Sequence, residues 1–386
     1  MSKPTITIIG GGIGGLTLAA GLHLRKIPVQ IYEAAPTFKE VGLGISLGPA
    51  AYRAMPLIHP QIQQIYNSLI TTHADSPGYD SYLQTWFELV WATGPQEGDV
   101  LMDLKALPSG QTALRRADFL NTLVELVPAE IVHFGKRLST LVEGDDGVVL
   151  GFEDGEVVKA DVVIGCDGIR SRVKECMFPV EHSLRAKPVY SGMYGYRAVL
   201  DMGDMDWEYE SWVRPAKRED MERDTRDMGR YVRALVEHMP DPSQWAIFEH
   251  PHLSTYTRSR IAILGDAAHA STPHQGAGAG QAIEDAHVLA ELLSDSRVSS
   301  VVDVVAAFKA YDEIRRPRSQ RVVTSSKENA DILCLCFEGV RDDPVKLRDT
   351  LDRRFKWLWD LDVRDQVERA RERMVEYLEI PMGKDL

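Results

Sequence analysis

The chain has 386 residues, which predicts about two or three globular lobes around sizeable cores and excludes a small scaffold held by disulfides. Its 57 Asp and Glu residues outnumber 44 Lys and Arg, and the formal charge of −13 argues against nucleic acid as a partner. Four cysteines are too few for a disulfide framework, and their spacing completes no zinc site. No apolar stretch reaches the roughly 20 residues that span a bilayer, and no cleavable hydrophobic segment precedes the first strand. We therefore expect a cytoplasmic protein, a monomer or homodimer, that binds no membrane and no metal.

The N-terminal segment has the pattern of a βαβ unit. A β-branched run at residues 5–9 leads into a glycine-rich turn, and the apolar residues that follow recur on one side of a helix. Pro28 closes this helix, and residues 29–33 return to a strand pattern. A parallel sheet is therefore expected to begin the protein.

Later elements are clear in some stretches only. No element can be assigned with confidence over residues 55–110, where Gly, Pro and aromatic residues are scattered. A helix is expected over residues 118–126 and a hairpin with a glycine turn over residues 148–158. Buried strands are expected over residues 160–165 and 261–266, the second of them ending at an acid, because both runs are strongly apolar.

The last part of the chain is predicted to be mostly helical. A long helix covers residues 279–293, and charged, helix-favouring sequence then runs from residue 303 to residue 373. Residues 315–318, which include Pro317, predict one interruption of that helical region.

The first motif that carries chemistry is Gly10-x-Gly12-x-x-Gly15, which lies between a strand and a helix. In such a turn the first glycine makes the bend, the second lets the backbone approach a pyrophosphate, and the third allows close packing. Glu33 ends the second strand, where a carboxylate binds an adenosine ribose hydroxyl. A glycine turn also occurs without a ligand, but this context predicts dinucleotide binding. The motif does not separate FAD from NAD.

Two later stretches decide that point. Cys166-Asp167-Gly168 follows one buried strand, and Gly265-Asp266-Ala267-Ala268-His269 follows another. With the N-terminal motif they resemble the class A FAD-dependent aromatic hydroxylases, in particular the salicylate hydroxylase-like flavoprotein monooxygenases. The resemblance covers about residues 5–320, and its most specific piece is residues 272–285.

The resemblance implies an α/β fold in which a Rossmann-like FAD-binding domain is interleaved with a smaller β-sheet substrate domain and followed by C-terminal helices. The FAD-binding domain is expected over residues 1–75, 100–185 and 255–325. The substrate domain is expected over residues 76–99 and 186–254, and the C-terminal helical region over residues 326–386.

The resemblance also implies the activity. A protein of this family is an FAD-dependent monooxygenase that uses NADH or NADPH and O2, through a flavin hydroperoxide, to hydroxylate a phenolic or aromatic-acid substrate. A related flavin epoxidase, a non-oxygenating flavin oxidoreductase and an inactive flavin-binding protein remain open as alternatives. A plain NAD dehydrogenase would explain neither of the two later motifs.

Residue roles follow from the same resemblance. It assigns cofactor binding to Gly10, Gly12, Gly15, Glu33, Arg116, Asp167, Asp266, Gly276, Gly278 and Ala279. The residue types suit those roles, since a guanidinium binds phosphate well and a carboxylate at a strand end accepts from a ribose or ribitol hydroxyl. The structural alternatives are a plain turn at Asp167, a helix N-cap at Asp266 and a surface residue at Arg116.

On the substrate side the candidates are Arg197, Pro273 and Tyr196. Arg197 either holds a substrate carboxylate or phenolate or makes a structural ion pair, and Pro273 resembles the proline whose backbone lies beside substrate and flavin. Tyr194 and Tyr196 are expected on opposite faces of a strand, with one of them lining the pocket. Neither His269 nor His274 is assigned as a catalytic base, and His269 is expected to pack and hydrogen-bond.

The sequence departs from the family pattern in its middle. Few strand-like residues lie between Arg197 and Gly265, although most of the substrate sheet is expected there. Either this sheet is shortened, or the sequence joins two ends across omitted residues, near residues 203–210. We favour the second, because removing strands would expose sheet edges and apolar faces.

Overall fold

The structure is a computed structural model that describes residues 3–37, 44–72, 83–108, 110–178, 187–197, 213–239 and 242–379. Residues 203–210, where the sequence departs from the family pattern, lie outside the described ranges.

A six-stranded sheet organises the larger part of the molecule. Its strands stand in the order β16-β17-β12-β1-β2-β8, and every neighbouring pair is parallel except β16 with β17. Their bounds are β1 (Ile6–Ile9), β2 (Val29–Tyr32), β8 (Val132–His133), β12 (Val162–Gly165), β16 (Thr257–Arg258) and β17 (Ile261–Ile263). The parallel sheet predicted from the N-terminal pattern is therefore confirmed.

The strand expected over residues 160–165 is in fact two elements. β11 (Val157–Ala160) ends before Asp161, and β12 starts after it. Asp161 accepts a hydrogen bond from the backbone N of Thr5 at 2.8 Å. The prediction of one continuous apolar strand was wrong, because a carboxylate separates the two runs.

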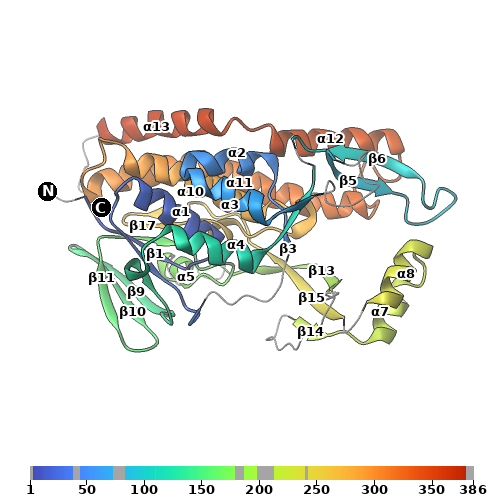
Figure 1. The fold of residues 1–386 in the computed structure, drawn as a ribbon, viewed down its shortest axis with the longest axis horizontal. Coiled ribbons are helices and arrows are strands. Elements are labelled where there is room, and N and C mark those ends of the chain that lie inside the picture. Colours follow the sequence, from blue (N-terminus) through green and yellow to red (C-terminus); the bar gives the residue numbers. More distant parts are fainter. Residues whose placement is uncertain are drawn as a thin grey trace.

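Layers cover both faces of the sheet. Figure 1 shows α1 (Ile13–Leu24), α10 (Gly278–Ser294) and other helices on one side, and the antiparallel sheet of β9 (Leu138–Gly144), β10 (Gly147–Phe152) and β11 on the other. The helix predicted over residues 118–126 is α4 (Arg116–Leu123) followed by a 3-10 turn. Apolar side chains from both layers form one continuous core with the central strands.

The stretch in which no element was assigned contains two helices and a hairpin. The elements are α2 (Pro49–Ile58), α3 (Pro60–Leu69), β5 (Thr85–Val90) and β6 (Val100–Lys105). Short strands β3 (Gly44–Ile45), β4 (Thr71–Thr72) and β7 (Thr112–Arg115) form a small sheet beside them. Each helix begins with proline at its first position, where the missing N–H is not needed.

A separate three-stranded sheet lies at the lower right of Figure 1, away from the sheet β9–β11. It has the order β13-β15-β14, with β13 (Val189–Arg197), β14 (Val213–Pro215) and β15 (Ser243–Glu249). Two short helices, α7 (Arg218–Thr225) and α8 (Arg230–His238), follow β14.

The C-terminal helices are α11 (Val301–Leu333), α12 (Pro344–Trp359) and α13 (Val363–Glu379). The interruption predicted at residues 315–318 was wrong, because α11 continues through Pro317. A proline removes one backbone hydrogen bond from a helix, and here Arg315 and Arg318 on either side make buried ion pairs that oppose a break.

A second core joins the hairpin β5–β6 to α12. Trp86, Phe355 and Trp359 are all at most 6% exposed, and the two tryptophan rings lie 5.3 Å apart. Ala277, which precedes α10, packs against this core. Phe355 and Trp359 therefore pack within the chain. None of the helices in the described ranges is long and apolar enough to cross a bilayer.

Candidate cofactor and substrate site

The chemistry-bearing motifs meet at one edge of the central sheet. Ile9 stands opposite both Tyr32 and Gly165, and Gly165 stands opposite Ile263. The residues that follow these strands are the glycine turn, Glu33, Cys166 and the turn that contains Gly265 and Asp266. The carboxyl edge of an open parallel sheet is where such folds bind ligands.

The glycine turn has the close contacts that its sequence predicted. Gly10 has a φ of +105°, and a Cβ there would lie 2.8 Å from the backbone N of Asp167. A Cβ on Gly15 would overlap with the Gly10 carbonyl oxygen. Gly12 differs, since the nearest atom to its Cβ would be Nη2 of Arg116 at 3.8 Å.

This difference tests whether the turn fits FAD. Gly10 and Gly15 are needed for the fold itself, but a Cβ on Gly12 would make only an ordinary contact with a guanidinium. Gly12 is also the N-cap of α1, whose first N–H groups have no partner within the helix. A pyrophosphate would find both backbone donors and a cation there. The turn therefore fits the phosphate part of the cofactor.

Glu33 is half-buried and accepts a hydrogen bond from the backbone of the glycine turn. Its Oε2 accepts from the backbone N of Gly11 at 2.6 Å, and Oε1 accepts from Ala35 at 2.8 Å. A carboxylate has about four lone-pair directions. Its oxygens therefore keep acceptor capacity for a ribose hydroxyl.

Asp266 lies in the first turn of the short helix α9 (Asp266–His269) and is exposed. Its side chain does not cap that helix, so the N-cap alternative is wrong. A Cβ on Gly278 would lie 3.8 Å from Oδ1 of Asp266, which places this carboxylate beside the start of α10. The residues expected to bind the flavin side of the cofactor are therefore neighbours in space.

Asp167 has a different environment. Its Oδ1 accepts from Ser171 at 2.5 Å, and Oδ2 accepts from the backbone N of Arg172 and Val173 at 2.7 and 3.0 Å. These bonds hold the start of α5 (Arg172–Met177). Burial raises the pKa of Asp167, and these hydrogen bonds oppose that rise. The local structural role that the sequence left open as an alternative is therefore present.

The loop between α9 and α10 carries Pro273, Gly276, Gly278 and Ala279. Pro273 and Gly276 are exposed, Gly276 has a left-handed φ of +61°, and Gly278 and Ala279 begin α10. Nothing lies within 4 Å of a Cβ built on Gly276. This loop presents an open, partly backbone-lined surface.

Side chains of α11 hydrogen-bond to the backbone of the same loop. The side chain of Asn329 donates to the carbonyl of His274 at 2.8 Å, and Ser326 donates to the carbonyl of Thr272 at 2.6 Å. His274 has a buried Nδ1 with no hydrogen-bond partner among the described residues. Burial lowers the pKa of His274, so a neutral ring is favoured. Sequence reasoning assigned His274 no role, and only the structure shows that one of its ring nitrogens is buried without a hydrogen-bond partner among the described residues.

On the substrate sheet, Tyr194 and Tyr196 lie on the same face. Both hydroxyls donate to Oδ2 of Asp224 in α7, at 2.7 and 2.6 Å. The expectation of opposite faces was wrong, because residues two apart on a strand point the same way. Burial and then the bond to Asp224 raise the pKa of Tyr196. The backbone of Arg197 pairs with Ser243, and its side chain lies outside what the structure describes.

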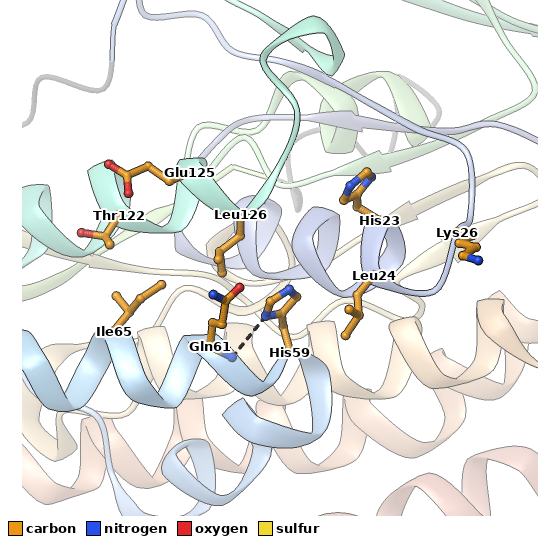
Figure 2. A pocket seen from close by; sticks show the side chains of 9 residues that line it. All are labelled: His23, Leu24, Lys26, His59, Gln61, Ile65, Thr122, Glu125 and Leu126. Carbon is orange, nitrogen blue, oxygen red and sulfur yellow. Dashed lines mark hydrogen bonds between the residues drawn. The ribbon is translucent and has the colours of Figure 1, made fainter.

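A cavity of about 680 Å³ lies elsewhere (Figure 2). Its lining includes His23 and Leu24 at the end of α1, His59 before α3 and Leu126 after α4. The glycine turn is at the opposite end of α1, about 18 Å along a helix of this length. None of the candidate site residues lines this cavity.

One feature of the site was not foreseen from the sequence. A group of buried charged side chains from α10 and α11 surrounds Asp285, behind the Gly265-Asp266 turn. Sequence reasoning treated Asp285 as the end of a motif and Arg315 as a helix breaker. Their pairing is long-range and has no local signal.

The comparisons with known proteins agree with the geometry. A model of the FAD binding domain matches residues 202–326. The 6-methylsalicylate 1-monooxygenase atA of Aspergillus terreus is 36% identical over 413 aligned positions, which cover 95% of this chain and 91% of that protein. A salicylate hydroxylase of Pseudomonas putida is 32% identical, with 96% and 94% covered.

A solved structure of salicylate hydroxylase in a substrate complex is also similar. It aligns with a TM-score of 0.82 and 28% identity and covers 96% of this chain and 98% of that one. The mixed α/β architecture is therefore that of the aromatic hydroxylases, as the sequence predicted. The chain belongs to the FAD-dependent aromatic hydroxylases, the salicylate hydroxylase-like flavoprotein monooxygenases.

Proposed function

We propose that this enzyme hydroxylates a small phenolic acid of the salicylate type, with NADH or NADPH as reductant and O2 as the oxygen source. The observation that carries the proposal is the arrangement at the carboxyl edge of the central sheet, where Arg116 lies beside Gly12 and Asp266 lies beside Gly278. The relatives named after salicylate and 6-methylsalicylate support the substrate class.

Bound FAD supplies the chemistry that accepts electrons from the nicotinamide and activates O2. We propose that the chain holds its pyrophosphate with the turn Gly10, Gly12 and Gly15 and with Arg116. Glu33 accepts from the adenosine ribose, and Asp266 accepts from the ribitol. Gly276, Gly278 and Ala279 lie along the flavin ring, and Asp167 contributes by holding the turn next to Gly10.

The substrate would lie between this loop and the sheet β13-β15-β14. We propose that Arg197 binds the substrate carboxylate, that the backbone at Pro273 bounds the ring, and that Tyr196 is a wall residue whose hydroxyl stays on Asp224.

The domain boundaries expected from the sequence remain part of the proposal. The FAD-binding parts correspond to the central sheet with β9–β11. The substrate part corresponds to β13–β15 with β5, and the expected boundary at residues 99–100 separates β5 from its partner strand β6. We also propose a cytoplasmic protein, a monomer or homodimer, with no nucleic acid or membrane as partner, which the charge of −13 supports. Light scattering after size-exclusion chromatography would test the oligomeric state.

We also propose that the substrate sheet is the part in which this chain is shorter than its relatives. The alignment to the 6-methylsalicylate enzyme runs over 413 positions, more than the 386 residues of this chain, so that relative carries residues that this chain lacks. Intact mass spectrometry is the direct check. A mass above that of 386 residues would show that the sequence omits a segment.

The proposed activity is tested by a visible spectrum of the purified protein and by NADH and NADPH oxidation with and without salicylate-type acids. The expected result is a flavin spectrum, substrate-stimulated oxidation and a hydroxylated product that carries label from isotopically enriched O2. An epoxide would favour the alternative flavin epoxidase. Flavin without stimulation by any aromatic acid would contradict the proposed activity.

A further inference from the structure

The charged group behind the Gly265-Asp266 turn joins four helices and is almost completely buried. We refer to it as the α10 network. Its members, all at most 9% exposed, are His269, Gln281, Glu284, Asp285, Arg315, Arg318 and Gln366. They come from α9, α10, α11 and α13.

Asp285 holds both ends of the segment that presents Asp266. Its Oδ2 accepts from the backbone N of Gly265 at 3.0 Å and from Nε2 of His269 at 2.6 Å. Gly265 precedes Asp266, and His269 ends the same short helix α9. Asp266 lies between these two fixed points and is itself exposed. The position of its carboxylate therefore depends on Asp285.

Arg315 fixes Asp285 in turn and ties it to the start of α10. Its Nε donates to Oδ1 of Asp285 at 2.7 Å, and Nη1 donates to Glu284 at 2.6 Å. Its Nη2 donates to the carbonyl of Gln281 at 3.2 Å and to the side-chain Oε1 of the same residue at 2.9 Å. Gln281 lies in the first turns of α10, directly after Gly278, Ala279 and Gly280. One guanidinium thus connects the Asp266 turn with the helix end that follows the flavin loop.

The charges within the network balance. Two carboxylates, Glu284 and Asp285, face the guanidiniums of Arg315 and Arg318. Burial by itself would raise the pKa of Asp285, but the neighbouring His269 and Arg315 lower it to about 2. The two carboxylates are therefore ionised at ordinary pH and are balanced by the two guanidiniums. The network leaves intact the partial positive charge at the start of α10.

Fold stability alone is a weak reason for such a network. Buried ion pairs lose hydration, and replacing them with apolar residues of similar volume is often neutral or stabilising. What this network provides is a fixed geometry. The Asp285 carboxylate accepts three hydrogen bonds, and its partner Arg315 also donates to Glu284 and Gln281, so that both segments proposed to contact the cofactor are held.

We infer that Asp285 is a positioning residue for FAD, which acts through Gly265, His269 and Arg315 to hold Asp266 and the start of α10 in place. This inference rests on the proposed contact between Asp266 and the cofactor. It assigns no contact between Asp285 and substrate or cofactor.

The test compares Asp285→Asn with Asp312→Asn. Asp312 is a matched control because its Oδ1 accepts from the backbone N of Tyr256 at 2.8 Å and from Nε of Arg316 at 2.9 Å, as Asp285 accepts from a backbone N and an arginine. For each variant we would measure FAD affinity of the apoprotein by fluorescence titration, the visible absorption of bound flavin and the melting temperature.

The expected result is that Asp285→Asn weakens FAD binding by about tenfold to a hundredfold, the effect of one lost charge-assisted bond, and alters the flavin absorption bands. Asp312→Asn should lower the melting temperature without weakening FAD binding or altering the flavin absorption bands. If Asp285→Asn does not fold, His269→Gln and Arg315→Lys are tested in its place. His269→Gln keeps a side-chain donor and should therefore retain most of the FAD affinity that His269→Ala loses.

Asp266→Asn distinguishes a failure of the positioning role of Asp285 from a failure of the proposed contact between Asp266 and FAD. If Asp266→Asn weakens FAD binding and Asp285→Asn behaves as Asp312→Asn does, the positioning role is overturned and the proposed site stands. If neither Asp266→Asn nor Asp285→Asn affects FAD binding or its spectrum, the proposed contact at Asp266 fails as well.

Discussion

Gly12→Ala separates the needs of the ligand from the needs of the fold. The nearest atom to the new methyl group would be Nη2 of Arg116 at 3.8 Å, an ordinary contact, and the φ of −69° suits alanine. Gly12 is the N-cap of α1, and alanine is a poorer N-cap, so the apoprotein should lose at most about 1 kcal/mol of stability.

Gly10→Ala should behave in the opposite way. Its φ of +105° costs an L-residue about 1–3 kcal/mol. Its Cβ would lie 2.6 Å from the carbonyl carbon of Cys166 and 2.8 Å from Asp167 N, and such overlap with backbone costs about 1–3 kcal/mol more. Together these are a large part of the about 5–15 kcal/mol that stabilises a typical protein.

For the cofactor the order is reversed. The methyl group of Gly12→Ala would occupy the space between the turn and Arg116 in which the pyrophosphate is proposed to lie. Loss of one charge-assisted bond from backbone N–H to phosphate corresponds to about a tenfold to hundredfold weaker affinity. The expected outcome is therefore a folded protein that binds FAD poorly.

The assay is fluorescence titration of the apoprotein with FAD, together with thermal unfolding without FAD. Gly144→Ala is the control, since its Cβ would lie 3.9 Å from the nearest atom and Gly144 belongs to β9, in another sheet. Equal FAD affinity of Gly12→Ala and Gly144→Ala would refute the reasoning. So would a Gly12→Ala apoprotein that unfolds as readily as Gly10→Ala.

Three further predictions concern other parts of the molecule. Phe355→Ala should lower the free energy of unfolding in urea by about 3–5 kcal/mol, because this ring is 2% exposed in the second core. Val345→Ala, on the same helix and 60% exposed, should change it by at most about 0.5 kcal/mol. Similar losses for both variants would contradict the packing. Burial and a neighbouring lysine lower the pKa of His250 to about 3 from 6.5, so the unfolded chain binds more protons between these values. Stability should therefore fall as the pH is lowered through that window, by at most about 1.4 kcal/mol per pH unit, and His250→Gln should reduce this slope in urea titrations at several pH values. Tyr196→Phe should leave substrate KM nearly unchanged, because the hydroxyl donates to Asp224; a large rise in KM would assign that hydroxyl to the substrate.

Motifs governed by local geometry could be predicted from the sequence. The glycine turn, Glu33 and the Gly265-Asp266 turn each follow a strand, and a parallel sheet brings strand ends to one edge whatever lies between them in sequence. Gly10 and Gly15 could likewise be predicted, because a Cβ at either position would overlap with backbone atoms and only glycine lacks one.

Features that depend on long-range pairing could not be predicted. Pro317 indicates a helix break by any local rule, yet α11 continues because Arg315 and Arg318 pair with acids of α10. Periodicity also missed the hairpin β5–β6, whose Trp86 is buried in a core to which α11 and α12 contribute. The partner of Tyr196 was missed for the same reason, since Asp224 is on a separate helix.

The unbroken course of α11 has a consequence for how this enzyme can diverge. One 33-residue helix carries Arg315, which fixes the Asp266 turn, and also Ser326 and Asn329, which hold the backbone of the loop around Pro273. Both segments proposed to contact the cofactor therefore share a single rigid support, and a change in one would strain the other. Among the described residues, the sheet β13-β15-β14 is joined to α11 at the end of β15, where Lys327 pairs with Glu249 at 2.5 Å. Selection for new aromatic substrates would accordingly act on that sheet and on α7, while the helix preserves the oxidative half of the enzyme.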